Sequence, residues 1–350
     1  MRRVVSSLHR ANGVRPAAAR TLALRPGGVA VLQQHVSPFS STSGKTRKPQ
    51  PPPLPEPSFV DVDGKCKIEY IDVQPEHASP STPTLVMLHG APGTYQDFRH
   101  IIPLLRDRGV RILGVNLPGF GNSTVLDRDN YYEHVSAMPS MRLTYSAVQR
   151  VLGHEHDNVF VLGHSFGGHA AVHFTGINAE QQQLKLKGLA LLASAGYRPH
   201  KALQPRTNEL VWRMLRSNVG VVERFAQWLT KQVYTRLLKF PAKGPNEYFA
   251  AGIVRCATAD FDRFAAQIEM NKQLPAFVAW ARDDAFIEED IFLAVGEQCH
   301  PGPRLAFERG GHNIQKTKAA LLANEMHRWI ADVVEGKVAA ANSSQIQVHP

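Results

Sequence analysis

The stretch from Val159 to Gly168, which reads VFVLGHSFGG, is the most informative part of this sequence. Four apolar residues typical of a buried strand lead into a G-x-S-x-G turn centred on Ser165, and a helical pattern follows over 166–178. Gly163 and Gly167 have no side chains that would clash across so tight a turn. A serine held on a turn between a strand and a helix projects its hydroxyl above the sheet. We therefore predict a nucleophile elbow with Ser165 at its tip.

On both sides of this turn, strand and helix patterns alternate along the chain. Asp63-Gly64 predicts a hairpin that joins strands over 59–61 and 65–73. The other predicted strands are 84–88, 110–115, 158–162, 186–193, 276–281 and 304–307. The other predicted helices are 94–106, 141–152 and 316–334. This alternation implies an α/β fold with a mostly parallel central sheet flanked by helices.

One long segment interrupts the alternation. Residues 197–272 contain no strand pattern, and the apolar residues of 222–237 recur at helical steps. We therefore expect a helical cap over 197–272, inserted into a core made of 59–196 and 273–336. A Pro-rich linker over 49–58 precedes the core, and the polar tail over 337–350 is expected to be disordered.

The basic charge of the chain is concentrated at its N-terminus. The formal net charge is +10, yet residues 1–55 carry nine Lys and Arg and no acid, while the rest is nearly balanced. This distribution argues against a nucleic-acid-binding surface on the folded part. Six spaced arginines in an acid-free segment over 1–48 predict a mitochondrial transit peptide, with the matrix as destination; a basic tail without a targeting role is the alternative.

Three further segments carry a resemblance to a known family. They are His89-Gly90-Ala91-Pro92-Gly93, the loop Asn116–Ser123 (NLPGFGNS), and Trp280-Ala281-Arg282-Asp283-Asp284. With the elbow, they resemble the α/β-hydrolase superfamily over about residues 59–335. The loop departs from the family pattern at Asn116, where an Asp is usual. The resemblance implies the α/β-hydrolase fold and a catalytic triad in the chain order Ser, acid, His.

A serine hydroxyl needs a base, and the base needs a carboxylate that orients it. His312 follows the last predicted strand, where the superfamily places its base; His300 precedes that strand and His327 lies in the closing helix. For the acid, the register of the family pattern selects Asp284 over Asp283, which we expect to be a solvated neighbour. The candidate catalytic residues are therefore Ser165, Asp284 and His312.

The resemblance also implies an oxyanion hole made by the backbone N–H groups of Phe166 and Ala91. His89 and His164 occupy positions that usually serve packing or turn geometry. We expect no metal site and no cofactor, because acyl transfer through such a triad requires neither. Three cysteines without C-x-x-C spacing do not predict a structural zinc site or a disulfide framework.

The sequence thus predicts a serine hydrolase that cleaves a small-molecule ester, thioester or amide. Acyl transfer to another acceptor and cleavage of a carbon–carbon bond would use the same triad, and a non-catalytic ligand- or partner-binding protein is the alternative from another class. The apolar stretches are too short for a transmembrane helix. Peripheral membrane contact through the cap is a further hypothesis, with Phe225, Trp228, Leu229 and Leu237 as its anchor.

Overall fold

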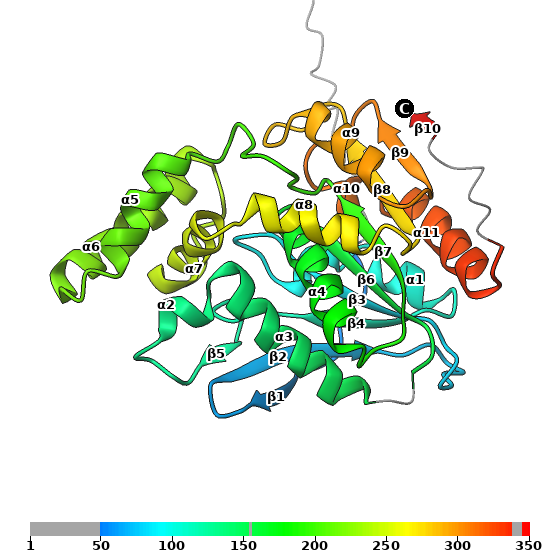
Figure 1. Ribbon diagram of the computed structural model, residues 1–350, viewed down its shortest axis with the longest axis horizontal. Helices are drawn as coiled ribbons and strands as arrows, with labels where there is room; N and C mark the ends of the chain where they lie inside the picture. Colours follow the sequence, from blue (N-terminus) through cyan, green and yellow to red (C-terminus); the bar gives the residue numbers. More distant parts are fainter. Residues whose placement is uncertain (1–49, 154–155, 338–344) are drawn as a thin grey trace, which may run out of the picture. The chain divides into compact units, whose positions relative to one another are not determined.

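The computed structural model describes residues 50–153, 156–337 and 345–350. The predicted transit peptide over 1–48 lies outside these residues. The compact unit runs from Gln50 to Pro350 and is built on one ten-stranded sheet (Figure 1). Its strands are β1 Ser58–Val62, β2 Cys66–Val73, β3 Thr84–Leu88, β4 Arg111–Val115, β5 Thr124–Val125, β6 Val159–His164, β7 Leu186–Leu192, β8 Ala276–Ala281, β9 Arg304–Phe307 and β10 Ile346–His349.

The strand order β1-β2-β4-β3-β6-β7-β8-β9-β10 makes the predicted sheet mostly parallel. Only the pairs of β2 with β1, β4 and β5 are antiparallel. The predicted hairpin joins β1 to β2, because Asp63 and Gly64 both have a positive φ and Lys65 donates its N–H to the Val62 carbonyl at 2.9 Å. Strands β3, β4, β6, β8 and β9 are buried along their whole length, as expected of strands covered on both faces.

Helices cover the sheet and form the insertion between β7 and β8. The helices outside that insertion are η1 Tyr95–Phe98, α1 Ile102–Arg106, α2 Tyr131–His134, α3 Ala137–Leu152, α4 Gly167–Gln181, α9 Glu289–Gln298, α10 Ile314–Thr317 and α11 Ala319–Val334. The helices inside it are α5 Pro205–Leu215, α6 Gly220–Gln232, the π-helical turn η2 Val233–Leu237, α7 Asn246–Ala257 and α8 Phe261–Met270. None of the helices in the described residues is both long and apolar enough to cross a membrane.

The insertion does not form a single layer. Helices α5, α6 and α7 contact one another and lie to one side of the sheet, whereas α8 packs on α4 (Figure 1). The side chain of Gln267 on α8 fills the space left by Gly176 on α4, and Phe264 stacks on His169 at 4.3 Å between ring centroids. The cap proper is therefore α5 to α7, and α8 is part of the helical layer that covers the sheet.

Several predicted elements differ from those observed. The single helix expected over 94–106 is divided into η1 and α1, because Pro103 lies in the first turn of α1 and cannot continue a preceding helix. The closing helix is divided at Lys318 into α10 and α11. The disordered tail predicted over 337–350 is wrong for 346–349, which form β10 by parallel pairing with β9. Elements β5, α2 and α9 are present in addition to the predicted ones.

Candidate active site

Ser165 lies on the turn between β6 and α4 in a strained backbone conformation. Its φ is +58°, which non-glycine residues rarely adopt. A Cβ atom on Gly163 would overlap the Gly167 carbonyl, and one on Gly167 would overlap the Leu88 carbonyl. The turn is also held by a hydrogen bond of 3.0 Å from the Ser165 N–H to the Leu192 carbonyl. The two glycines are therefore required by close backbone approach, as the elbow predicts.

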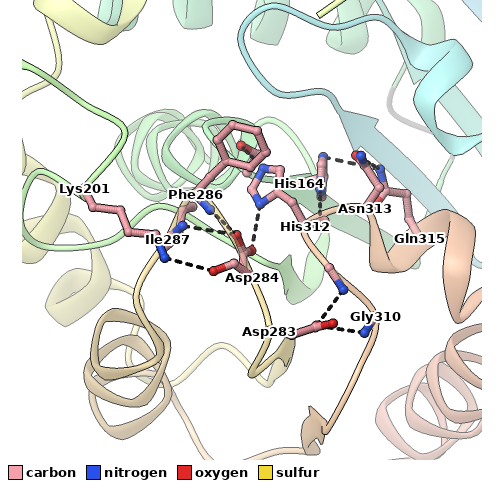
Figure 2. Close-up of polar contacts among 12 residues, drawn as sticks. His164, Lys201, Asp283, Asp284, Phe286, Ile287, Gly310, His312, Asn313 and Gln315 are labelled. Carbon is pink, nitrogen blue, oxygen red and sulfur yellow. Dashed lines mark hydrogen bonds and ion pairs between the residues drawn. The ribbon is translucent and has the colours of Figure 1, made fainter. Parts of the chain in front are cut away.

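The three candidate catalytic residues meet in one hydrogen-bonded chain. His312 Nε2 lies 2.8 Å from Ser165 Oγ, and His312 Nδ1 lies 2.7 Å from Asp284 Oδ2. His312 lies in the loop between β9 and α10, and Asp284 lies in the loop after β8 (Figure 2). The carboxyl ends of parallel strands lie at one edge of the sheet, which brings residues about 120 and 150 positions apart in sequence to one place.

Asp284 and Asp283 have different partners. The side chain of Asp284 is 1% exposed, and its Oδ1 accepts the N–H groups of Phe286 at 2.8 Å and Ile287 at 3.1 Å. Burial acts to raise the pKa of Asp284, but the hydrogen bonds from His312 and from these two amides outweigh it, so the pKa is lowered. Asp284 is therefore an ionised carboxylate that accepts a hydrogen bond from the imidazole.

Asp283 is exposed, as predicted for a solvated neighbour, but it also has a structural role that the sequence did not indicate. Its Oδ1 accepts the N–H groups of Gly310 at 2.8 Å and Gly311 at 2.7 Å (Figure 2). These two glycines immediately precede His312. Asp283 thus fixes the loop that carries the imidazole, while Asp284 contacts the imidazole itself.

The two predicted oxyanion-hole amides lie beside the nucleophile. Phe166 is the N-cap residue of α4, so no carbonyl of the same helix accepts a hydrogen bond from its N–H. Ala91 follows Gly90, and a Cβ atom on Gly90 would lie 3.1 Å from the Ser165 Cβ. Both residues therefore belong to segments that contact Ser165, and the oxyanion hole formed by their N–H groups stays a prediction.

The buried histidines His89 and His164 serve structure, as expected. Leu117 donates its N–H to His89 Nε2 at 3.0 Å, and His89 Nδ1 lies 2.7 Å from the Gly90 carbonyl. His164 Nε2 lies 3.0 Å from the His312 carbonyl, so it positions the backbone of the candidate base (Figure 2). Burial lowers the pKa of each to about 3, and both are neutral near pH 7.

Two supporting residues were missed in the sequence analysis. Buried Glu69 on β2 accepts hydrogen bonds from the side chains of Asn116 at 2.5 Å and Asn122 at 2.7 Å, which ties down the NLPGFGNS loop. Lys201 donates its Nζ to the Asp284 carbonyl at 3.0 Å (Figure 2). Both side chains approach from distant parts of the chain, so local sequence patterns could not identify them.

A pocket of about 460 Å³ opens onto this arrangement. Ser165 and His312 line it from the core, and apolar side chains of the cap and of the β8–α9 loop line it as well: Leu238, Phe240, Tyr248, Phe249 and Phe286. The ring of Phe286 packs on His312 at 5.1 Å between centroids. In the described part of the chain, no three His, Cys, Asp or Glu side chains gather as a metal site would require. A serine–histidine–carboxylate chain in a partly apolar pocket can activate a hydroxyl against a carbonyl carbon.

Comparisons with known proteins agree with this fold. The sequence profile of a family described as alpha/beta hydrolase of unknown function (DUF1057) matches residues 58–320. An uncharacterized protein of Caenorhabditis elegans is 25% identical over 249 residues, which are 66% of this chain and 66% of that protein. The chain therefore spans just under two thirds of the length of this relative. A 2-hydroxy-6-oxononadienedioate/2-hydroxy-6-oxononatrienedioate hydrolase of Cupriavidus pinatubonensis is 28% identical over 66% of this chain and 81% of its own. Among solved structures, an esterase of Exiguobacterium antarcticum is similar with a TM-score of 0.56 and 17% identity, over 78% of this chain and 99% of that one.

Proposed function

Because the chain belongs to the alpha/beta hydrolase family DUF1057, we propose that it hydrolyses a carboxylic ester, thioester or amide through Ser165, His312 and Asp284. One observation carries this proposal. The hydrogen bonds Ser165–His312 and His312–Asp284, at 2.8 and 2.7 Å, form an unbroken chain at the wall of a pocket large enough for a small substrate.

The reaction proceeds in two acyl transfers. Ser165 Oγ attacks the carbonyl carbon while His312 Nε2 takes the hydroxyl proton and passes it to the departing alcohol, thiol or amine. The amides of Phe166 and Ala91 stabilise the oxyanion of the tetrahedral intermediate. Water then attacks the acyl-enzyme, with His312 again as the base, and releases the acid and free Ser165. Asp284 holds the His312 Nδ1–H in place and stabilises the imidazolium formed in each step.

The test uses a fluorophosphonate probe, which labels an activated serine without knowledge of the substrate. We expect the full chain to be labelled and to hydrolyse p-nitrophenyl butyrate. Ser165→Ala and His312→Ala should lose both activities, and Asp284→Asn should lower kcat about 10⁴-fold. His327→Ala on α11 is the matched histidine control and should retain both. If folded wild-type protein is neither labelled nor active, the binding-protein alternative replaces the proposal.

One comparison favours a second candidate reaction for the same triad, the hydrolysis of an oxo-dienedioate. The Cupriavidus pinatubonensis relative is named for the hydrolysis of an oxo-dienedioate. An acyl acceptor other than water, or a carbon leaving group, would leave the roles of Ser165 and His312 unchanged. Product analysis by mass spectrometry in ¹⁸O-water separates hydrolysis from acyl transfer, because hydrolysis places one labelled oxygen in the released acid and acyl transfer to another acceptor does not. A carbon leaving group is recognised by the mass of the second product, since its cleavage by water labels the acid in the same way.

For localisation, we propose import into the mitochondrial matrix. Its support is the acid-free segment over 1–48 with six spaced arginines. A fluorescent fusion of the full chain should co-localise with a matrix marker, and replacing Arg2, Arg3, Arg10 and Arg15 by Gln should leave it in the cytosol. Matrix localisation of that variant would contradict the proposal.

A further inference from the structure

The mouth of the pocket is basic. Its lining includes the side chains of Arg99, Lys239, Lys243 and Lys316, while Asp97 is the carboxylate among the lining residues. All four cations are exposed, and none of them forms an ion pair or a side-chain hydrogen bond with the residues the structure describes. Many other exposed cations of this molecule do have a carboxylate partner, as Arg128 has Glu247 and Arg198 has Asp290. Among the described residues, no carboxylate thus forms an ion pair with any of these four cations.

The four cations come from two parts of the chain, the core and the cap segment. Arg99 follows η1, and Lys316 lies in α10, which contacts η1. Besides burial, the charges of Arg99 and Lys316 lower the pKa of His100, so both cations act on the same region of the core. Lys239 and Lys243 line the same pocket from the cap segment between η2 and α7. A ligand in this pocket would meet positive charge contributed by both the core and the cap.

The carboxyl of Asp97 compensates this charge only in part. It accepts the Thr94 N–H at 3.1 Å, and desolvation raises its pKa to about 6. Even fully ionised, it balances one of four cations. The positive potential at the mouth therefore persists at neutral pH, and it favours an anionic ligand over a neutral one.

The aromatic residues of the pocket lining indicate that the ligand also has an apolar segment. Phe240, Tyr248, Phe249 and Phe286 line the same pocket as Ser165. A substrate that reaches the nucleophile would place an apolar segment against these rings and a charged group at the basic mouth.

From this arrangement we propose that the natural substrate carries an anionic group, a carboxylate or a phosphate, bound between Arg99 and Lys316 of the core and Lys239 and Lys243 of the cap. The proposal rests on the proposed hydrolase function and assigns its substrate class. Because the four side chains are solvent-exposed, each should contribute about two- to fivefold in kcat/KM, and the contribution should decrease as salt screens the charges.

The experiment compares matched substrates that differ in charge. One pair carries the anion on the acyl part, mono-p-nitrophenyl glutarate against p-nitrophenyl butyrate. The other pair carries it on the leaving group, butyryl-coenzyme A against butyryl-N-acetylcysteamine. We expect kcat/KM of the full chain to favour the anionic member of at least one pair by tenfold or more at low salt. The pair that shows the preference identifies whether the anion belongs to the acyl part or to the leaving group.

Substitution of the four cations tests whether the preference for anionic substrates arises at the pocket mouth. The quadruple variant Arg99→Gln, Lys239→Gln, Lys243→Gln and Lys316→Gln should bring the ratio of the two kcat/KM values close to one. The matched control Arg142→Gln with Lys187→Gln, two exposed cations that do not line the pocket, should keep the wild-type ratio. Thermal melting verifies that each variant is folded.

Two results would overturn the proposal: equal kcat/KM for both members of both pairs, or a preference that survives in the quadruple variant. If the protein is labelled by fluorophosphonate but hydrolyses none of the four substrates, the comparison is made on labelling. Glutarate or coenzyme A should then slow labelling of wild type more than of the quadruple variant, and equal labelling rates reject the basic mouth. Absence of labelling in folded protein instead rejects the hydrolase function on which the proposal rests.

Discussion

At the residue scale, the short G-x-S-x-G pattern is sufficient to predict the tight turn of the nucleophile elbow. Ser165 has the positive φ that the G-x-S-x-G turn predicts, and the neighbouring glycines are where a side chain would overlap backbone. The acid required more than the pattern, because Asp283 and Asp284 differ in role by a single position. The structure separates them through their partners, the loop amides for Asp283 and the imidazole for Asp284.

Substitution of Gly163 tests the close backbone packing of the elbow. Gly163→Ala would place a methyl group on the Gly167 carbonyl, so we expect the free energy of unfolding to decrease by about 1–3 kcal/mol through overpacking. Gly296→Ala is the matched control, since it lies within α9 and its new Cβ would meet only ordinary contacts with Arg304 at 3.4 Å. Because alanine favours a helix interior, the control should be stabilised by about 0.5–1 kcal/mol. Urea denaturation of both variants measures the difference, and a neutral Gly163→Ala would contradict the packing argument.

At the scale of elements, the strands were easier to predict than the helices. Strands β3, β8 and β9 have the predicted bounds, because each is a short apolar run buried on both faces. Strand β10 escaped prediction because it lies at the sheet edge, where three of its four residues are exposed and no apolar pattern is needed. Helix α8 was assigned to the cap because helical periodicity does not indicate which surface a helix packs on.

The loop before α10 gives a prediction at this scale. Asp283→Ala removes the acceptor of the Gly310 and Gly311 N–H groups, so the loop that carries His312 should lose its fixed position. We expect kcat to fall by roughly ten- to hundredfold with little change in KM, as for a misplaced catalytic group. Asp283→Asn keeps an acceptor oxygen and should restore most of kcat. Glu308→Ala, which removes only the exposed pair with Arg282, is the control. An unchanged kcat in Asp283→Ala would mean that the loop does not need this anchor.

At the scale of the whole molecule, the order Ser, acid, His, together with the family register that selects Asp284, predicts residues that meet in the fold, because the sheet topology determines where they lie. The surroundings of the site were not predictable in the same way. Glu69 and Lys201 reach it from other parts of the chain, and the basic mouth combines η1, α10 and the cap segment after η2. Such contacts depend on how distant segments pack, which no local pattern in the sequence encodes.

The buried histidines make the stability of the whole molecule depend on pH. Burial lowers the pKa of His89, His164 and His169 to about 3 and that of His173 to about 4. Their unfolded pKa is near 6.5, so below that pH the unfolded chain binds protons that the folded protein does not. Stability should therefore fall as pH decreases from 6.5, by about 1 kcal/mol per histidine and pH unit. Asp97 has a raised pKa and opposes this trend, but it is one group against four.

Urea unfolding at pH 7.5 and 5.5 measures this dependence on pH. The free energy of unfolding should be several kcal/mol lower at pH 5.5 in wild type. His169→Asn should show a smaller decrease, by about one histidine's share, whereas replacement of the exposed His77 by Gln should leave the decrease unchanged. Equal stability at the two pH values would show that the buried histidines gain protons without unfolding.

Membrane contact through the cap also concerns the whole molecule, and it stays a prediction. Six of the twelve exposed large apolar side chains in the described residues lie between Leu210 and Leu237. Phe225 and Trp228 stack on one another at 5.8 Å, while Leu229 is partly buried and is not part of the exposed set. Residues 205–239 also carry seven Lys and Arg against two acids. Exposed aromatic and aliphatic side chains among cations are suited to the interface of an anionic bilayer.

Co-sedimentation of the full chain with vesicles tests this contact. Binding to phosphatidylcholine vesicles that contain cardiolipin should exceed binding to phosphatidylcholine alone, because each cation near an anionic surface contributes about 1 kcal/mol. Replacing Phe225, Trp228 and Leu237 by Ser should lower the bound fraction at least tenfold. Replacing Leu126 and Val334, exposed apolar residues outside the cap, should leave it unchanged. Equal binding of both variants would show that the apolar cap surface is not the anchor. If both variants bind equally and only high salt abolishes binding, the cations, including those at the pocket mouth, are the groups that contact the lipid.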